Sequence, residues 1–416
     1  FTLFSTCISL YDGGAVHATD SVVVASNLQL LNNRAGIFGG AILVSEKASF
    51  NLTKSTFQGN VAWLGGGLAM DRDSKASVAH TSFTDNQARM GGAFYVSVNE
   101  DVVTFEHSLF ANNQARFGSA LFIEFSYVNV EDCIVKNNVA TLFAAVRVTG
   151  VGGFSASSSL FQSNLAQKGG AMYADDTTQV NLFNSTFAEN VAEDDGGAIY
   201  CGGATDVKIY GCRFNANIAK QGQGGAVSRT NGARLLVDQL NRGTIQKTTF
   251  SNNKAKSVGG AMSLNSLLCR SATTCATNAD SVNTMTSAYE SCRSGDARAS
   301  SINNDVSQAM DVLEPCTDIQ NVYFENNSAA AGAGIFWHRQ WHIDVAEHAK
   351  YLPCNTATAG TQATTCTFIN NVASPCSSCN PTTDPGCYSC TSNIQTDTQT
   401  IQMGWSPGFN QSIQSG

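Results

Sequence analysis

The chain has 416 residues and a net charge of −8, and only 13% of its residues are charged, about half the usual share for a globular protein. A weakly charged, mildly acidic surface argues against nucleic acid as a partner, and no apolar run is long enough to span a membrane. The sequence begins at Phe1 without Met or a signal peptide, so we interpret it as a mature chain or a fragment and infer secretion only indirectly.

A glycine pair followed by Ala and an aliphatic residue recurs along most of the chain. Gly13, Gly39, Gly65 and Gly91 open copies that are 26 residues apart. Later copies open at Gly118, Phe143, Gly169, Gly196, Gly224, Gly259 and Gly332. A second element, aromatic-x-x-Asn-x-Ala, precedes the glycines, as in 187–192. A fixed period of this length is the signature of a repeat architecture.

The local pattern within each repeat is typical of short β-strands. Phe50 and Leu52, for example, precede Phe57 with one variable residue between them, and this period of two indicates a strand. Leucine-rich repeats fit worse, because the Leu-x-x-Leu-x-Leu frame and a helix in each repeat are both missing from the sequence. The sequence therefore predicts an all-β fold, a right-handed parallel β-helix of about 26 residues per coil with cysteine-rich loop insertions.

Stacking of equivalent residues gives the repeated positions a structural meaning. In a β-helix each residue lies about 4.8 Å from its equivalent in the next coil. Phenylalanines such as Phe187 then fill the interior, and asparagines such as Asn190 form an amide ladder. The glycines supply turn conformations with positive φ. We expect these residues to build the fold and not a functional site.

The chain divides into four parts. Residues 1–264 carry regular coils, and residues 265–316 form a cysteine-bounded insertion. The last coils, 317–373, contain a second insertion at 337–366, and residues 374–416 form a cysteine-rich tail or cap. The first coil shows no amphipathic capping segment, so we expect upstream sequence or another molecule to cover it.

Fourteen cysteines are present, mostly after residue 268, and they favour disulfides in an oxidising compartment. The disulfide candidates are Cys201, Cys212, Cys269, Cys275, Cys292, Cys316, Cys354, Cys366, Cys376, Cys379, Cys387 and Cys390. Cys212 is close enough in sequence to pair with Cys201, whereas Cys133 lies three coils from Cys212 and is expected to be a buried thiol. The pairs Cys376/Cys379 and Cys387/Cys390 also suit zinc, but their separation is short for a zinc ribbon and we favour disulfides.

N-glycosylation sequons occur at Asn51, Asn184, Asn326 and Asn410. The sequon is a weak motif, but beside so many cysteines it favours a secreted glycoprotein. We therefore expect an extracellular or cell-surface location.

A cluster of aromatic and histidine residues follows the loose coil at Gly332. His338 and His342 are spaced to share a helical face, and Asp344 and His348 follow, so a metal site is an alternative. The zinc-protease motif requires Glu after the first His, and Arg339 stands there. We expect no metal and no cofactor, and an aromatic loop that contacts the solenoid or a partner. The partner-binding candidates are Trp337, Trp341 and Tyr351.

The tandem Gly-Gly-Ala-[Ile/Leu/Val] and Phe-x-x-Asn elements resemble the repeats of chlamydial polymorphic membrane proteins. They are also similar to repeats of large extracellular β-helix proteins of algae and other protists. The match covers residues 13–262 well and 317–373 loosely. This resemblance implies a β-helical fold and, for the chlamydial family, passenger regions that act as surface adhesins; the motif residues that carry over are structural.

Three functions are compatible with these observations. We favour a non-enzymatic extracellular structural glycoprotein, a subunit of a cell-surface filament, wall or appendage that binds itself or other extracellular structural proteins. The alternative is a surface adhesin or glycan-binding module that uses the insertions at 265–316 and 337–353.

A polysaccharide lyase or hydrolase is the third function, since pectin-degrading enzymes have this fold. Hydrolysis needs paired carboxylates, and the candidates are Asp175, Asp176, Asp194 and Asp195, near the glycine turns. Asp is common in turns for structural reasons, and the polygalacturonase signatures are absent from the sequence. We therefore expect no enzymatic activity.

Overall fold

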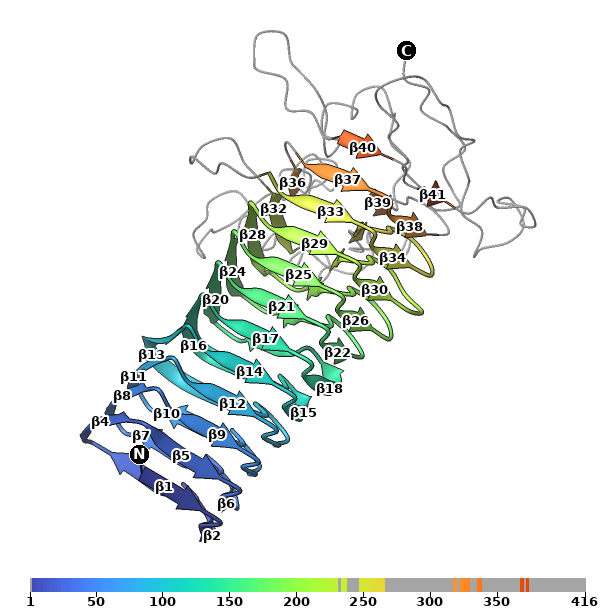
Figure 1. Ribbon diagram of the computed structural model, residues 1–416. Helices are drawn as coiled ribbons and strands as arrows, with labels where there is room; N and C mark the ends of the chain where they lie inside the picture. The colour runs from blue at the N-terminus through green and yellow to red at the C-terminus, as the bar shows by residue number, and fades with distance from the viewer. Residues whose placement is uncertain are drawn as a thin grey trace, which may run out of the picture.

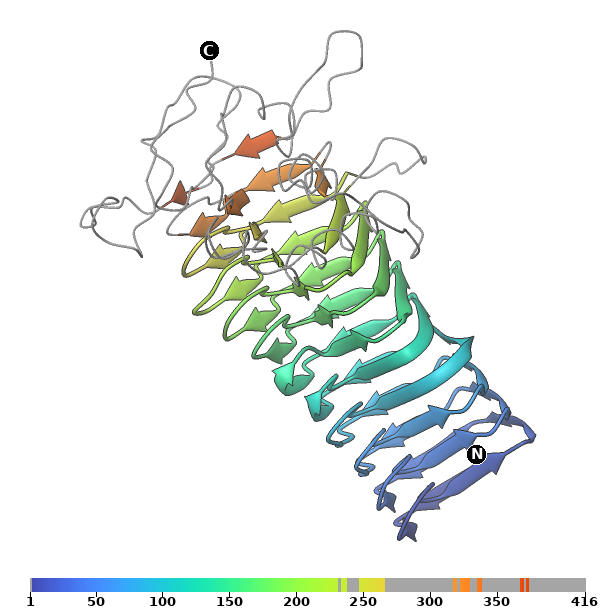
Figure 2. The ribbon, with the colours of Figure 1, turned by 180° about the vertical axis from the view of Figure 1, so that it is seen from behind.

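The structure, a computed structural model, describes residues 2–230, 233–237, 247–265, 317–319, 322–329, 335–338, 367–369 and 372–373. All regular elements of these residues are β-strands that pair in parallel, and they stack into a rod with the N-terminus at one end (Figure 1). The described part of the chain contains no helix that is long and apolar enough to cross a membrane. The view from behind shows the same even stacking of coils (Figure 2).

Three sheets run along the rod. The 12-stranded sheet consists of β1 (Thr2–Ser5), β5 (Leu28–Leu31), β9 (Thr56–Gln58), β12 (Ser82–Thr84), β14 (Leu109–Ala111), β17 (Ile134–Lys136), β21 (Leu160–Gln162), β25 (Thr186–Ala188), β29 (Arg213–Asn215), β33 (Thr249–Ser251), β37 (Tyr323–Glu325) and β40 (Thr367–Ile369). The 8-stranded sheet consists of β15 (Gln114–Phe117), β18 (Val139–Phe143), β22 (Leu165–Ala166), β26 (Val191–Ala192), β30 (Ile218–Ala219), β34 (Lys254–Ala255), β38 (Ser328–Ala329) and β41 (Val372–Ala373). The pair β2 (Ile8–Ser9) and β6 (Arg34–Ala35) is linked to it by single bridges.

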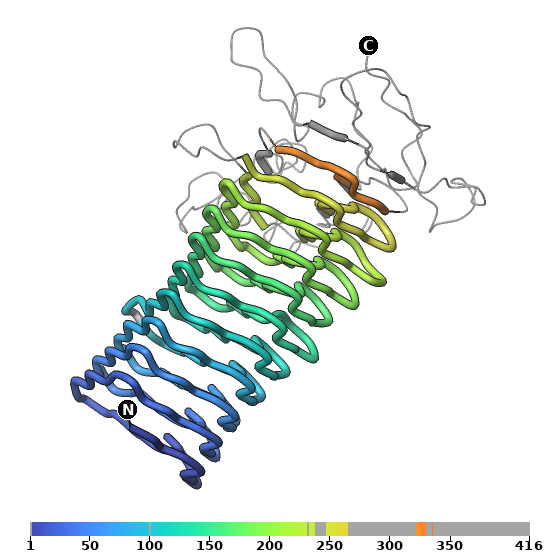
Figure 3. The backbone as a smooth tube through the Cα atoms, viewed as in Figure 1, coloured from blue at the N-terminus to red at the C-terminus, as the bar shows by residue number. Residues whose placement is uncertain are grey.

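The 19-stranded sheet receives two strands or one long strand from each coil. It consists of β3 (Val16–Thr19), β4 (Val22–Ser26), β7 (Ile42–Ser45), β8 (Ser49–Thr53), β10 (Leu68–Asp71), β11 (Lys75–Ala79), β13 (Phe94–Glu106), β16 (Leu121–Glu131), β19 (Val146–Thr149), β20 (Gly152–Ser157), β23 (Met172–Ala174), β24 (Thr178–Phe183), β27 (Ile199–Cys201), β28 (Asp206–Tyr210), β31 (Val227–Arg229), β32 (Arg234–Val237), β35 (Met262–Asn265), β36 (Thr317–Ile319) and β39 (Ile335–His338). The backbone tube shows that successive coils turn at the same places along the rod (Figure 3).

Each repeat forms one coil, and equivalent residues stack. Phe57 pairs with Phe83 and Phe83 with Phe110 along the 12-stranded sheet. Their rings are parallel, with centroids 4.5 and 5.0 Å apart. All three side chains are fully buried, which stabilises the fold by roughly 1.5–3 kcal/mol each. The predicted β-helix and its phenylalanine column are confirmed.

The asparagine column forms the predicted amide ladder. Asn60 Nδ2 donates to Asn86 Oδ1 at 2.9 Å and to the Leu30 carbonyl at 2.9 Å. The same Asn86 oxygen accepts the backbone N–H of Asn60 at 3.0 Å. Equivalent bonds continue to the pair Asn253 and Asn327, so a fully buried polar column is satisfied from coil to coil.

The glycine pairs make a corner that side chains resist. Gly39 has a φ of 62°, and a Cβ on Gly40 would lie 2.1 Å from the Gly66 carbonyl oxygen. The degenerate copy keeps this geometry without glycine, because Ala144 has a φ of 47°. The pair therefore serves both the turn and the close approach of adjacent coils.

The solenoid continues on the far side of the first predicted insertion. β35 ends at Asn265, and β36 begins at Thr317 and pairs with β32. Residues 266–316 and 374–416 lie outside the described part of the chain, as do most of those at 337–366.

Candidate functional face

The outward-facing side chains in the first half of β7, β10, β13 and β16 form an apolar row. Because side chains alternate along a strand, Leu43, Ala69, Tyr95 and Phe122 point out of the coil while their neighbours fill the core. These four residues nevertheless form a buried cluster. The side chains that cover it are Phe38, Leu64, Met90 and Phe117. We call this surface, with the two edges described next, the outer face.

One edge of the outer face is a basic ridge, formed by Ile37, Trp63, Arg89 and Arg116. Backbone bonds hold it in register, since the Arg89 N–H donates to the Trp63 carbonyl and the Arg116 N–H donates to that of Arg89. The Arg89 guanidinium lies 4.7 Å from the Trp63 ring centre, and Trp63 is 50% exposed. Within the described residues, neither guanidinium forms an ion pair.

The opposite edge is an apolar corner, formed by Val98, Phe125 and Val151. These side chains are 60%, 50% and 62% exposed, respectively. Val98 and Phe125 have φ values of 51° and 46°, a conformation that is costly for branched and bulky residues. The Phe125 ring lies across Gly150, where a Cβ would meet its Cδ1 at 2.8 Å. The positive φ recurs at this corner in other coils, as at Glu46, Arg72 and Asp176, so it belongs to the coil geometry. What distinguishes these coils is the exposed apolar side chains, which mark a candidate interaction surface.

The same corner is charged in other coils. Glu46 and Arg72 occupy it towards the N-terminus, joined by an ion pair of 2.6 Å, and Asp176 occupies it beyond the apolar corner. Asp101 lies beside Val98 and is 3.3 Å from Lys75 Nζ. The apolar corner therefore spans three coils, and charged residues occupy the same corner in the coils on either side.

Carboxylates and hydroxyls line the inner side of this corner. Glu124 Oε2 accepts hydrogen bonds from the Tyr95 hydroxyl at 3.3 Å and the Ser97 hydroxyl at 3.1 Å. Burial raises the pKa of Tyr95 to about 12. Burial also raises the pKa of Asp71, and the Arg72 guanidinium only partly opposes this shift.

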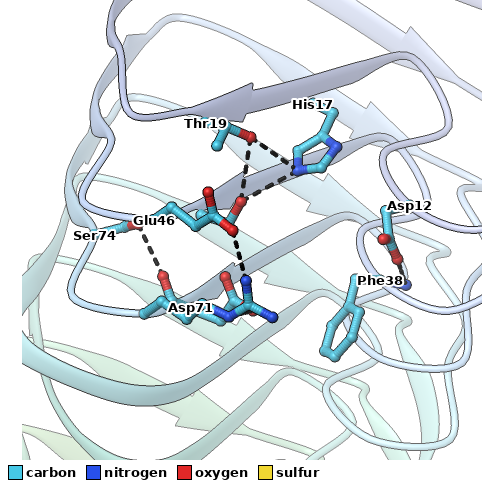
Figure 4. A network of polar contacts seen from close by, with 9 residues as sticks. Asp12, His17, Thr19, Phe38, Glu46, Asp71 and Ser74 are labelled. Atoms are coloured by element: carbon cyan, nitrogen blue, oxygen red, sulfur yellow. Dashed lines mark hydrogen bonds and ion pairs between the residues drawn. The ribbon is translucent and has the colours of Figure 1, made fainter.

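A polar network closes the N-terminal end of the outer face (Figure 4). His17 Nε2 lies 3.1 Å from the Ser45 hydroxyl and 3.2 Å from that of Thr19. Across the face, Asp12 Oδ1 accepts the Phe38 N–H at 3.3 Å. The His17–Ser45 and Asp12–Phe38 bonds connect the first two coils.

An aromatic and cationic ladder extends the face towards the C-terminus. The Arg147 guanidinium is 4.9 Å from the Phe143 ring centre and 4.3 Å from that of Tyr173. Tyr173 stacks on Tyr200 with centroids 4.8 Å apart. Because these groups occupy one another's ring faces, the ladder stabilises the rod and leaves mainly ring edges for a ligand.

The four carboxylates weighed as hydrolase candidates take part in separate local structures. Asp175 Oδ2 accepts from Arg147 Nη2 at 2.9 Å, while burial raises the pKa of Asp175 despite this cation. Asp176 accepts from the Thr149 hydroxyl and the Gly150 N–H at 2.8 and 3.1 Å.

The other two acids belong to the next glycine turn. Asp195 Oδ1 accepts the Gln223 N–H at 2.9 Å, and its Oδ2 lies 3.5 Å from Lys168 Nζ. Asp194 donates its backbone N–H to the Gln167 carbonyl at 2.8 Å. These contacts are the structural roles that Asp commonly has in turns.

The structure confirms the prediction for Cys133 and contradicts the one for Cys201. Cys133 is a free buried cysteine, as predicted, and burial raises its pKa to about 11. Cys201 is also free, so the predicted disulfide with Cys212 is wrong. Cys201 faces the core from β27 in register with Arg229, whereas Cys212 follows β28 and donates its N–H to the Thr248 hydroxyl. The two thiols belong to different columns of the coil.

The other ten disulfide candidates lie outside the described residues. The same holds for the partner-binding candidates Trp341 and Tyr351 and for His342 and His348. Trp337 and His338 belong to β39, but their side chains are not described. Within the described residues, no group of three or more potential ligand side chains could hold a metal.

Three of the four sequon asparagines are described, and all three are exposed. Asn51 lies on β8, while Asn184 and Asn326 lie at corners with φ values of 47° and 53°. Asn410 lies outside the described residues. All three side chains therefore lie on the surface of the rod.

Sequence reasoning missed the basic ridge, the apolar corner and the Arg147 ladder. These surfaces combine unlike side chains from successive coils, so they leave no repeated residue type in the sequence. The available signal was the change from charged to apolar residues at one corner position, from Arg72 to Val98 and Phe125.

Comparisons with known proteins agree with the architecture. The family model of the right-handed β-helix region matches residues 4–146. The repeat of the Chlamydia polymorphic membrane proteins matches residues 184–202. No curated protein and no solved structure matches the chain significantly. The chain is a right-handed parallel β-helix repeat protein whose repeats resemble those of the Chlamydia polymorphic membrane proteins.

Proposed function

We propose that the chain is a non-enzymatic extracellular structural glycoprotein, a rod-shaped subunit of a cell-surface filament, wall or appendage. The observation that carries this proposal is the amide ladder, which links the described coils from Asn33 to Asn327. A continuous ladder beside a stacked phenylalanine column gives a stiff rod. Such a rod suits a mechanical or spacing role.

An extracellular location is supported by three features. The sequon residues Asn51, Asn184 and Asn326 are exposed, the chain has 14 cysteines, and residues 184–202 resemble a repeat of membrane proteins. The structural contacts of the candidate acids, such as Asp175 with Arg147, support a role without catalysis.

Electron microscopy of the native material, extracted without reducing agent, tests this proposal. We expect ordered polymers that contain the protein, and a mobility shift of the protein after enzymatic removal of N-glycans. Dispersed single rods in the native material would refute the structural role.

Surface adhesion or glycan binding is a second candidate, favoured by the exposed aromatic residues Trp63 and Phe125 on the outer face. A glycan and cell-binding screen compares the full chain with variants that lack the insertions at 265–316 or 337–353. Loss of binding in a deletion variant that remains folded supports adhesion through the insertions. Binding that survives both deletions but is lost in Trp63→Ala assigns adhesion to the outer face, and no binding by the full chain rejects adhesion.

A further inference from the structure

We propose that two copies of this chain pair side by side through their outer faces, with parallel rod axes, so that the basic ridge of each copy contacts the apolar corner of the other. This inference rests on the structural function proposed above and names the contact by which subunits associate. It is carried by the juxtaposition of two unlike edges on one apolar face.

The outer face has the composition of a protein interface. Its edges expose Trp63, Phe125 and two arginines, Arg89 and Arg116, and Trp, Phe and Arg are enriched at interfaces. The row between the edges contributes further apolar surface from side chains such as Met90. Exposed apolar side chains at both edges, such as Trp63 and Phe125, are typical of an interaction site.

The two edges differ in net charge. The ridge is basic, whereas the corner edge carries two ion pairs, Glu46 with Arg72 and Asp101 with Lys75, together with further carboxylates. Arg89 and Arg116 form no ion pair with the described residues. The corner is flanked by the carboxylates of Asp73, Asp101 and Asp176, which lie before, beside and beyond its apolar residues. A second copy therefore offers the ridge arginines an edge on which carboxylates outnumber cations.

Symmetry then decides the direction of the partner rod. A two-fold axis parallel to the rods places ridge against corner at both edges, which is an isologous contact. A two-fold axis across the rods makes them antiparallel and places ridge against ridge, so that the arginines repel one another. Charge complementarity selects the parallel pair.

The repeat brings the facing residues to matching heights. Arg89 and Val98 are nine residues apart within one coil, and Arg116 and Phe125 have the same separation. Nine residues of a coil of about 26 correspond to about a third of the ~4.8 Å rise. A parallel two-fold axis therefore places Arg116 beside the second copy's Phe125, a cation–π geometry, and repeats the match in adjacent coils.

Sedimentation velocity of the purified full chain tests the pairing. The ridge variant is Arg89→Glu with Arg116→Glu, and the corner variant is Asp73→Lys with Asp101→Lys. The control variant, Lys54→Glu with Arg213→Glu, makes the same charge change as the ridge variant at exposed positions outside the outer face. Circular dichroism and a thermal melt check that each variant folds.

We expect the wild-type chain and the control to form dimers that weaken as salt increases. Each face variant alone places like charges at both contacts and should dimerise on the order of 100-fold more weakly. An equimolar mixture of the two face variants should dimerise again, because ridge and corner charges are then opposite at both contacts of the mixed pair. Recovery only in the mixture supports ridge-to-corner pairing.

Three results would overturn the proposal: a monomeric wild-type chain at high concentration, face variants that dimerise like the control, or folded face variants whose mixture stays monomeric. Ordered native polymers together with any of these results would reject this contact and leave the structural function standing. Single rods in native material would reject the structural function itself.

Discussion

Val98 shows how one residue can be unfavourable for the single rod and favourable for a contact. It is β-branched, mostly exposed, and has a φ of 51°, where a non-glycine residue costs about 1–2 kcal/mol. Asn accepts this conformation more readily than Val. We therefore predict that Val98→Asn raises the free energy of unfolding by about 1 kcal/mol and weakens dimerisation.

Urea denaturation and sedimentation of the same samples measure both effects. Val102→Asn is the matched control, because Val102 is also exposed on β13 but has no positive φ. Equal stability changes in the two variants would contradict the assigned strain.

The raised pKa of Asp71 predicts that the stability of the fold depends on pH. Because burial raises the pKa of Asp71 above 3.8, the folded state keeps a proton that the unfolded state loses as the pH rises through the interval just above 3.8. The folded state binds more protons there, so the free energy of unfolding falls with increasing pH. Asp71→Asn should remove this part of the slope when urea midpoints are measured as a function of pH, and an unchanged slope in the variant would contradict the assignment.

At the scale of the element, we expect substitutions in the asparagine column of the amide ladder to destabilise the fold more than substitutions in any other column. Asn164 Nδ2 donates to Asn190 Oδ1 and to the Val135 carbonyl, and its own Oδ1 accepts from Asn138. We predict that Asn164→Ala lowers the free energy of unfolding by about 3 kcal/mol or more, since several buried groups lose their partners together. Asn51→Ala, at an exposed strand position, should change it by less than about 0.5 kcal/mol, and similar urea midpoints for both variants would contradict the ladder's role.

The stacking of strands explains which residue positions could be predicted from the sequence and which could not. Phe57, Phe83 and Asn60 were predictable because stacking requires like residues at one position of every coil. Arg89 and Phe125 were not, because an outer contact across two edges leaves no repeated residue type. The wrong pairing of Cys201 has a similar cause, since proximity in sequence does not say which wall of the coil a side chain faces.

At the scale of the whole molecule, the closed rod should protect its interior thiols. Burial raises the pKa of Cys133 to about 11 and that of Cys201 to about 12, so the reactive thiolate is scarce as well as inaccessible. We predict that both remain unmodified by an alkylating reagent at pH 8 in the folded protein and react fully in denaturant, while the half-buried Cys7 reacts first. Peptide mass spectrometry measures this order, and early modification of Cys201 would show that the rod opens near β27.

The central claim is that stacked coils form a stiff rod that works as a structural subunit by pairing with copies of itself. Cryo-electron microscopy of the native assemblies, isolated without reducing agent, tests it most directly. The account predicts ordered polymers built from pairs of parallel rods, with coils about 4.8 Å apart, in which the two copies of each pair contact each other through ridge and corner. Single rods dispersed in the native material would contradict the claim.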